Sequence, residues 1–149
     1  MSEPRKVTIQ YRVPYADTDQ MHVVYYANYL AYFERSRNEL IRETGVTYKE
    51  LETRGYALPV AEAHLNYHAP ATYDDLLELT SWVEGLKGAR LTIRCEVRRG
   101  EKLLVTGHTV HAIVEIKTMR PVRHAEELRG LLGCESGDTE ANPPPAKRE

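Results

Sequence analysis

The chain is organised around residues 13–29, which read Val13-Pro14-Tyr15-Ala16-Asp17-Thr18-Asp19-Gln20-Met21-His22-Val23-Val24-Tyr25-Tyr26-Ala27-Asn28-Tyr29. Pro14 has no backbone N–H, and Asp17 and Asp19 carry short side-chain oxygens that favour turns and helix N-caps. The stretch therefore predicts an irregular segment up to about residue 23 and a long helix over residues 24–43. A carboxylate beside the free N–H groups of a buried helix start can act on a carbonyl that those groups polarise.

Apolar and aromatic residues occupy more than one face of this predicted helix. Two rows have helical spacing: Tyr26, Leu30, Phe33, Arg37 and Leu40 in one, and Tyr25, Tyr29, Tyr32 and Ser36 in the other. We therefore expect the helix to be wrapped by the rest of the chain. The tyrosines of the second row either line an acyl or aryl pocket or pack in the core, and the pattern leaves both open.

Most of the remaining chain has the period-two alternation of strands. We predict strands over residues 6–13, 56–69, 76–84, 89–98 and 103–117, with short helices over 47–54 and 124–132. Thr47 and Glu50 have the spacing of a capping box, and Pro59 restricts its strand to a sheet edge or a strand start. One long helix followed by consecutive strands predicts an α+β fold, an antiparallel sheet curled around the helix.

Composition limits the organisation and the partners of the chain. Its 149 residues suffice for one domain, which we place at residues 1–132; residues 133–149 have almost no apolar side chains and are expected to be disordered. A net charge of −2 with mixed signs gives no basic footprint for nucleic acid. No run is long and apolar enough to span a membrane, and the polar start lacks a secretory signal, so we expect a cytoplasmic protein. Cys95 and Cys134 do not suggest a disulfide framework.

Residues 15–29, together with Tyr32-Phe33-Glu34-Arg35-Ser36-Arg37, resemble a known family. They are similar to the hotdog-fold acyl-CoA thioesterases of the 4-hydroxybenzoyl-CoA thioesterase type, and also to the Tol-Pal-associated thioesterases. The likeness continues through Pro59 and residues 67–71 to about residue 129. It implies a hotdog fold and hydrolysis of an acyl- or aryl-CoA thioester without a further cofactor or metal.

The resemblance also implies roles for individual residues. It makes Asp19 the catalytic carboxylate and has the main-chain N–H of Tyr26 contact the thioester oxygen. His22 stands where the family usually has glycine, which requires a different backbone conformation or places an imidazole near the reaction centre. Lys87 and Arg90 meet the phosphates of coenzyme A in this comparison, although a solvated hairpin accounts for them equally well.

The chemistry is also reasonable without the family. The leaving thiol of a thioester has a pKa near that of cysteine, about 8.5, so its expulsion needs little acid assistance. A carboxylate is ionised at neutral pH, and that of Asp19 could attack directly or orient a water. The sequence does not separate these routes. It contains no Gly-x-Ser-x-Gly elbow to support a serine nucleophile.

Other polar residues have competing interpretations. Asp17 and Asp19 also suit plain turn or capping roles, and we expect Asp17 to shape the loop. Glu34 is a rival catalytic carboxylate, but an ion pair with Arg37 three residues later is favoured. Glu62 fits a polar contact at the pocket edge. Alternation places His64 and His68 on the same side as Glu62, and His108 and His111 on opposite sides of their strand, so no compact metal site is expected.

Two further expectations concern assembly and rival functions. A small sheet covered by one helix leaves exposed strand edges, and pairing these between two copies predicts at least a homodimer. The resemblance implies active sites between subunits, often in a homotetramer of paired dimers. The alternatives to an acyl-CoA thioesterase are a thioesterase acting on acyl-carrier-protein thioesters and a module that binds acyl-CoA without cleaving it.

Overall fold

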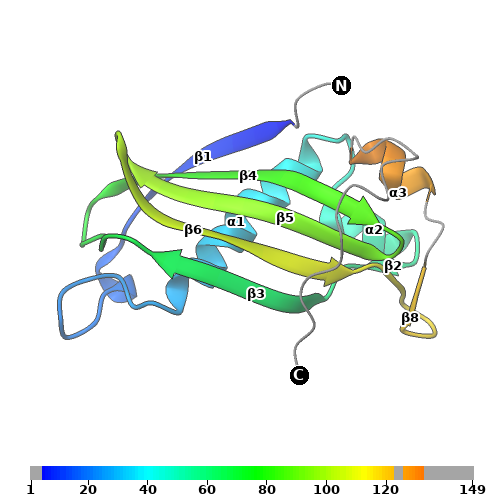
Figure 1. Cartoon of the computed structure of the whole chain (residues 1–149), viewed down its shortest axis with the longest axis horizontal. Helices are drawn as coiled ribbons and strands as arrows, with labels where there is room; N and C mark the ends of the chain where they lie inside the picture. Colours follow the sequence, from blue (N-terminus) through cyan, green and yellow to red (C-terminus); the bar gives the residue numbers. More distant parts are fainter. Residues whose placement is uncertain (1–4, 123–125, 133–149) are drawn as a thin grey trace.

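The computed structural model describes residues 5–122 and 126–132 (Figure 1). A single turn of 3-10 helix, Tyr15–Asp17, lies in the loop between β1 and α1. The elements in chain order are β1 Lys6–Arg12, α1 Asn28–Arg42, α2 Tyr48–Thr53, β2 Tyr56–Ala57, β3 Val60–Tyr67, β4 Leu76–Lys87, β5 Arg90–Arg99, β6 Lys102–Ala112, β7 Val114–Glu115, β8 Arg120–Pro121 and α3 Glu126–Leu131.

The main sheet has the strand order β1-β4-β5-β6-β3, and every neighbouring pair is antiparallel. Helix α1 runs behind it in Figure 1 and packs chiefly on β4, β1 and β5. A smaller sheet has the order β2-β7-β8. One long helix on one face of an antiparallel sheet is the α+β hotdog arrangement expected from the sequence, and that expectation is confirmed.

The alternation of β5 shows how the sequence builds this packing. Leu91, Ile93, Cys95 and Val97 are buried, whereas the residues between them are partly exposed on the outer face. From α1, Phe33 packs against Gly107 of β6 so closely that a Cβ on Gly107 would lie 3.0 Å from the Phe33 ring and 2.3 Å from the carbonyl oxygen of His64. Glycine is therefore required at position 107 for α1, β6 and β3 to pack this closely.

Helix α1 begins at Asn28, so the predicted start at residue 24 is wrong. The backbone of residues 24 and 25 is instead used to fix the loop. The N–H of Val24 donates to the carbonyl of Ala71 at 2.8 Å, and the N–H of Tyr25 donates to the carbonyl of Asp17 at 2.9 Å. These long-range bonds hold the segment extended and delay the helix by about one turn.

Two predicted strands are each divided in the structure. The strand over residues 56–69 breaks into β2 and β3 at Leu58 and Pro59, because proline has no N–H with which to continue the ladder. The strand over 103–117 ends at Ala112, since the N–H of Ile113 donates to Ala89 at 2.8 Å and the chain then joins β2 as β7. Conversely, β4 continues to Lys87, beyond the predicted end at residue 84.

Helix α1 buries one face against the sheet, and its other face is exposed in the single chain. Tyr29, Tyr32, Phe33 and Leu40 are among its buried residues, but Leu30 is 42% exposed. The predicted capping box of α2 is confirmed: the side chain of Thr47 accepts from the N–H of Glu50, and Glu50 accepts from the N–H of Thr47. The predicted tail at 133–149 lies outside the described residues, as does the start of the helix predicted at 124.

Candidate active site

Asp17 is the structural carboxylate of the loop between β1 and α1. Its Oδ2 accepts hydrogen bonds from the hydroxyl groups of Tyr11 at 2.9 Å and Tyr32 at 2.7 Å, which come from β1 and α1. Its carbonyl oxygen accepts from the side-chain amide of Asn28 at the start of α1. Burial raises the pKa of Tyr32, and the hydrogen bond to the Asp17 carboxylate raises it further. These contacts fit the expectation that Asp17 shapes the loop.

Asp19 is two residues further on and is much less engaged. Its backbone closes a tight turn, in which its N–H donates to Val23 at 3.0 Å and its carbonyl accepts from His22 at 2.8 Å. The side-chain Oδ1 accepts from the N–H of Met21 at 2.9 Å, while Oδ2 has no hydrogen-bond partner within the described chain. The half-buried carboxylate is therefore oriented through one oxygen, and the other is available to react.

His22 adopts the left-handed backbone conformation that its position in the turn requires, with φ of 69°. This conformation favours glycine and is uncommon for a residue with a Cβ. The histidine thus keeps the geometry that glycine would give the turn. Its side chain is exposed, and no hydrogen bond joins its ring to another described residue.

Tyr26 precedes α1 by two residues, and its N–H donates to no acceptor among the residues described. Free N–H groups at a helix start carry partial positive charge. The neighbouring Tyr25 has a raised pKa, first through the Tyr26 side chain and to a smaller degree through the charge of Asp19. The charge of Asp19 therefore acts on the side chain of Tyr25, the residue before Tyr26.

The aromatic surroundings divide into exposed and buried rings. The side chains of Tyr25 and Tyr26 are exposed, with ring centroids 4.9 Å apart, whereas Tyr29 is only 3% exposed. Tyr67 on β3 completes the group: its hydroxyl donates to the carbonyl of Tyr26 at 3.2 Å, and its ring lies 5.7 Å from that of Tyr29. Sequence reasoning missed the contact of Tyr67 because nothing local pairs residue 67 with residue 26.

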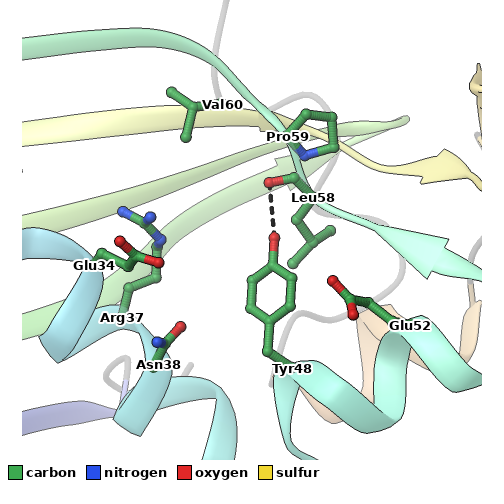
Figure 2. Close-up of a pocket in the computed structure, with 8 residues that line it drawn as sticks. All are labelled: Glu34, Arg37, Asn38, Tyr48, Glu52, Leu58, Pro59 and Val60. Atoms are coloured by element: carbon green, nitrogen blue, oxygen red, sulfur yellow. Dashed lines mark hydrogen bonds between the residues drawn. The ribbon is translucent and has the colours of Figure 1, made fainter. Parts of the chain in front are cut away.

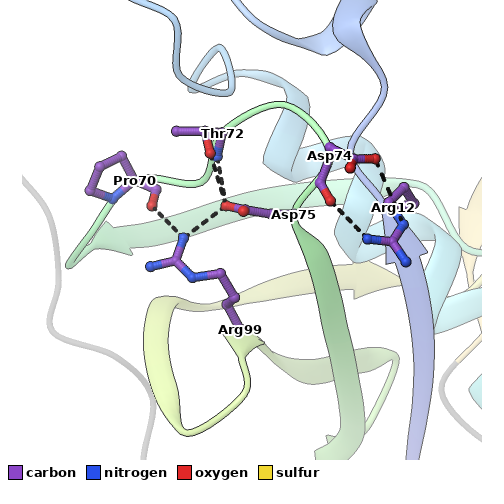
Figure 3. A network of polar contacts seen from close by, with 6 residues as sticks. All are labelled: Arg12, Pro70, Thr72, Asp74, Asp75 and Arg99. Carbon is purple, nitrogen blue, oxygen red and sulfur yellow. Dashed lines mark hydrogen bonds and ion pairs between the residues drawn. The ribbon is translucent and has the colours of Figure 1, made fainter.

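A polar network between Arg99 and residues 70–75 supports the loop between β1 and α1 (Figure 3). The Nη1 atom of Arg99 donates to Asp75 Oδ2 at 2.8 Å and to the carbonyl of Pro70 at 3.3 Å. Asp75 Oδ2 also accepts from the N–H of Thr72 at 2.8 Å. This network fixes residues 70–75, whose Ala71 carbonyl in turn binds Val24.

The other residues predicted to bind substrate, Glu62, Lys87 and Arg90, lie away from Asp19 in the same chain. Glu62 on β3 pairs with Arg90 on β5 at 3.5 Å, and Lys87 is at the same end of β4. Arg99, at the other end of β5, contacts Pro70 and Asp75 beside the Asp19 loop, and the nine residues from Arg90 to Arg99 span roughly 30 Å. The turn between β4 and β5 is therefore at the opposite end of the sheet from the Asp19 loop. Within one protomer the structure does not bring Lys87, Arg90 or Glu62 to Asp19.

The ion pair expected between Glu34 and Arg37 does not form, since the described residues provide no acidic oxygen within 4 Å of the Arg37 guanidinium. Arg37 turns inward instead and is 8% exposed. Burial lowers its pKa, and its Nε has no acceptor in the described part of the chain. Beside it is an open groove of about 450 Å³ lined by Glu34, Arg37, Asn38, Tyr48, Glu52, Leu58, Pro59 and Val60 (Figure 2).

The histidines are dispersed. His111 is buried between the carbonyl of Leu58 and the hydroxyl of Thr109, at 2.9 Å from each. His108 stacks on His64 on the outer face of the sheet, with ring centroids 5.6 Å apart. No three metal-ligating side chains gather within residues 5–122 and 126–132. The described helices include none with the length and apolar character needed to cross a bilayer.

Comparisons with known proteins agree with this architecture. The family model of the thioesterase-like superfamily matches residues 13–132. The acyl-CoA thioesterase YbgC of Haemophilus influenzae is 34% identical over 122 residues, 81% of this chain and 90% of that protein. The acyl-CoA thioester hydrolase YbgC of Escherichia coli O6:H1 is 32% identical over 111 residues, 74% of this chain and 83% of its own length.

Comparison with solved structures also identifies a thioesterase with the same fold. The crystal structure of DHNA-CoA thioesterase from Staphylococcus aureus superposes with a TM-score of 0.80 at 26% identity, covering 86% of this chain and 89% of that one. The family match spans the loop with Asp19, helix α1 and the whole main sheet except β1. The chain therefore belongs to the thioesterase-like superfamily.

Proposed function

We propose that the protein hydrolyses acyl-CoA thioesters, with Asp19 as nucleophile or general base and the N–H of Tyr26 polarising the thioester carbonyl. Two observations carry the proposal: among the described residues, one carboxylate oxygen of Asp19 has no hydrogen-bond partner, and the N–H of Tyr26, two residues before α1, has no acceptor. The names of the relatives, acyl-CoA thioesterase and acyl-CoA thioester hydrolase, support the substrate class.

The proposed chemistry needs only these two groups. The Tyr26 N–H and the positive end of the 15-residue helix α1 stabilise the oxyanion that develops on the thioester carbonyl. The Asp19 carboxylate attacks the carbonyl carbon or removes a proton from the attacking water. The thiolate of coenzyme A leaves without an acid, because its pKa is only about 8.5. No metal or further cofactor takes part.

The active form is proposed to be a homodimer or a dimer of dimers. Among the described strands, β3 pairs only with β6 and β1 only with β4, so these two strands are the unpaired edges of the main sheet. Exposed Tyr25, Tyr26, Leu30 and Tyr67 lie along the same region of the molecule. Pairing two β3 edges satisfies their backbone groups and covers these rings. It also allows Lys87 and Arg90 of one copy to approach the substrate at Asp19 of the other.

The test is release of free thiol from short, long and aromatic acyl-CoAs. Asp19→Asn should reduce turnover by roughly two to four orders of magnitude, the usual scale for a positioned base or nucleophile. The matched control is Asp74→Asn, an exposed loop carboxylate with positive φ that asparagine tolerates. Turnover in Asp19→Asn equal to that of the control would exclude Asp19 as the catalytic group.

The same measurements separate the alternatives. A protein that binds acyl-CoA tightly but releases no thiol is a binding module. Activity confined to acyl-carrier-protein thioesters would show that the substrates are those thioesters and not acyl-CoAs. Circular dichroism of both variants checks that neither substitution has unfolded the chain. Thermal midpoints that match the wild type assign any loss of turnover to chemistry.

A further inference from the structure

Arg37 is a buried cation whose Nε has no hydrogen-bond acceptor among the described residues. It is 8% exposed, its Nε lacks an acceptor, and none of the described side chains forms an ion pair with it. Figure 2 shows its guanidinium extending from α1 towards Val60 at the start of β3. A buried guanidinium without an acceptor is costly, and this one borders an open groove, so an acceptor from outside the chain is expected there.

The groove favours a small, neutral oxygen-bearing group. Its volume of about 450 Å³ suits a small acyl moiety, and Leu58, Pro59 and Val60 give it an apolar wall. The hydroxyl of Tyr48 is already used, since it donates to the carbonyl of Leu58 at 3.0 Å. Glu34 and Glu52 also border the groove and would repel a second carboxylate. A hydroxyl or keto oxygen can accept from Arg37 without that repulsion.

The direction of β3 determines which Asp19 loop of the proposed dimer, its own or that of the partner, lies next to this groove. Val60, at one end of the strand, lines the groove, while Tyr67, at the other end, binds the carbonyl of Tyr26. The seven steps between them cover roughly 23 Å. Antiparallel pairing of two β3 edges about a twofold axis places the Val60 end of one copy beside the Tyr67 end of the other. In the proposed dimer, the groove of one protomer therefore adjoins the Asp19 loop of its partner.

We propose that Arg37 is a specificity-determining residue that acts across the dimer, donating a hydrogen bond from its guanidinium to a neutral oxygen on the acyl group of a thioester held at Asp19 of the partner subunit. This inference rests on the function proposed above. It makes oxygenated acyl groups better substrates than plain alkyl groups of the same length.

The test compares kcat/KM for matched pairs of acyl-CoAs with four to eight carbons, in which one member carries a hydroxyl or keto oxygen. Arg37→Met keeps the length of the side chain and removes its donors, and replacing a buried charge by an apolar group is compatible with folding. The preference for the oxygenated member should fall by roughly 10- to 100-fold, the scale of one hydrogen bond to a charged group. Arg37→Lys, which moves the donor, should show the same loss if Arg37→Met does not fold.

The matched control is Arg42→Met on the same helix, where the arginine is exposed and pairs with Glu39 at 3.5 Å. Its preference should equal that of the wild type. Thiol release with an unchanged preference in Arg37→Met overturns this inference and leaves the hydrolase proposal intact. No thiol release by the wild-type protein overturns the hydrolase proposal itself. A stronger preference for acyl groups ending in a carboxylate overturns the assignment of a neutral ligand.

Mixed dimers test whether Arg37 acts across the interface. In a dimer of one Asp19→Asn chain and one Arg37→Met chain, the only functional carboxylate belongs to the Arg37→Met chain. If Arg37 acts in trans, that carboxylate works beside the intact Arg37 of the other chain, and the wild-type preference returns. If the mixed dimer keeps the preference of Arg37→Met, or if the active protein is a monomer, the trans arrangement is wrong.

Discussion

Replacing Asp75 by asparagine should loosen residues 70–75, which support the segment proposed to be catalytic. Asp75 Oδ2 accepts three hydrogen bonds, from the N–H of Thr72 at 2.8 Å, the Thr72 hydroxyl at 3.2 Å and Arg99 Nη1 at 2.8 Å (Figure 3). Its backbone carbonyl also accepts from the N–H of Val13 at 2.9 Å. The substitution keeps the shape of the side chain and one carbonyl oxygen but removes the charge that Arg99 faces.

The expected loss follows from these contacts. A hydrogen bond to a charged group contributes about 1.5–3 kcal/mol, and a neutral one about 1 kcal/mol. Asparagine can retain the bonds to Thr72 in neutral form and weakens the contact with Arg99. The Asp75 side chain is 21% exposed, so solvent screens the pair only in part. We expect Asp75→Asn to lower the free energy of unfolding by about 1–2 kcal/mol at pH 7.

The loss should depend on pH in a definite direction. Burial acts to raise the pKa of Asp75, but the Thr72 N–H and the Arg99 guanidinium together outweigh burial and lower the pKa below its ordinary value. A carboxyl group with a lowered folded-state pKa stabilises the protein above its unfolded pKa, about 3.9, and loses this contribution as the pH falls through the folded value. The difference between wild type and Asp75→Asn should therefore shrink below about pH 4.

Urea unfolding at pH 7 and at pH 3 measures both effects, with Asp74→Asn as the control for an adjacent, exposed carboxylate. Equal midpoints for wild type and Asp75→Asn at pH 7 would refute the assigned strength of the network. A difference that persists undiminished at pH 3 would refute the role of the Asp75 charge.

Two further predictions concern buried positions. Gly107→Ala places a Cβ 2.3 Å from the His64 carbonyl oxygen, so β3 must move away from β6. We expect the free energy of unfolding, measured by a thermal or urea melt, to fall by about 1–3 kcal/mol. Gly130→Ala, where a Cβ meets nothing within 4 Å, is the control, and equal effects of the two substitutions would contradict the packing argument. Burial lowers the pKa of His111 to about 4, so the wild type should lose stability as the pH falls from about 6.5 towards 4, because the unfolded chain takes up the proton first. His111→Asn should flatten that part of the stability curve, and an unchanged slope would assign the effect to other histidines.

The sequence predicts best what depends on neighbours in the chain. The strand alternation of β5 and the Thr47–Glu50 capping box are local patterns, and both are present in the structure. The start of α1 is missed because the acceptors for Val24 and Tyr25 come from Ala71 and Asp17, through bonds that no local propensity reveals. Tertiary hydrogen bonds outweigh the helix propensity of a few residues.

The candidate site shows the same limit. Asp17 and Asp19 have the same chemistry and nearly the same sequence context, so their separation into structural and candidate catalytic groups rested on the family resemblance. In the structure, Tyr11 and Tyr32 bind the first carboxylate and none of the described side chains binds the second. Arg37 was expected to pair with Glu34 along the helix surface, but its side chain is buried and lines a groove together with Val60 of β3, a contact that the helical spacing does not reveal.

The two tyrosine bonds to Asp17 also bear on the motion of the loop. Because the donors belong to β1 and α1, the segment before Asp19 can move away from the fold only if both hydrogen bonds break. The amides of this segment should then exchange with deuterium more slowly than those of an ordinary surface loop. The backbone that carries Asp19 is thus tied to two elements of the fold, a constraint that an ordinary surface loop lacks.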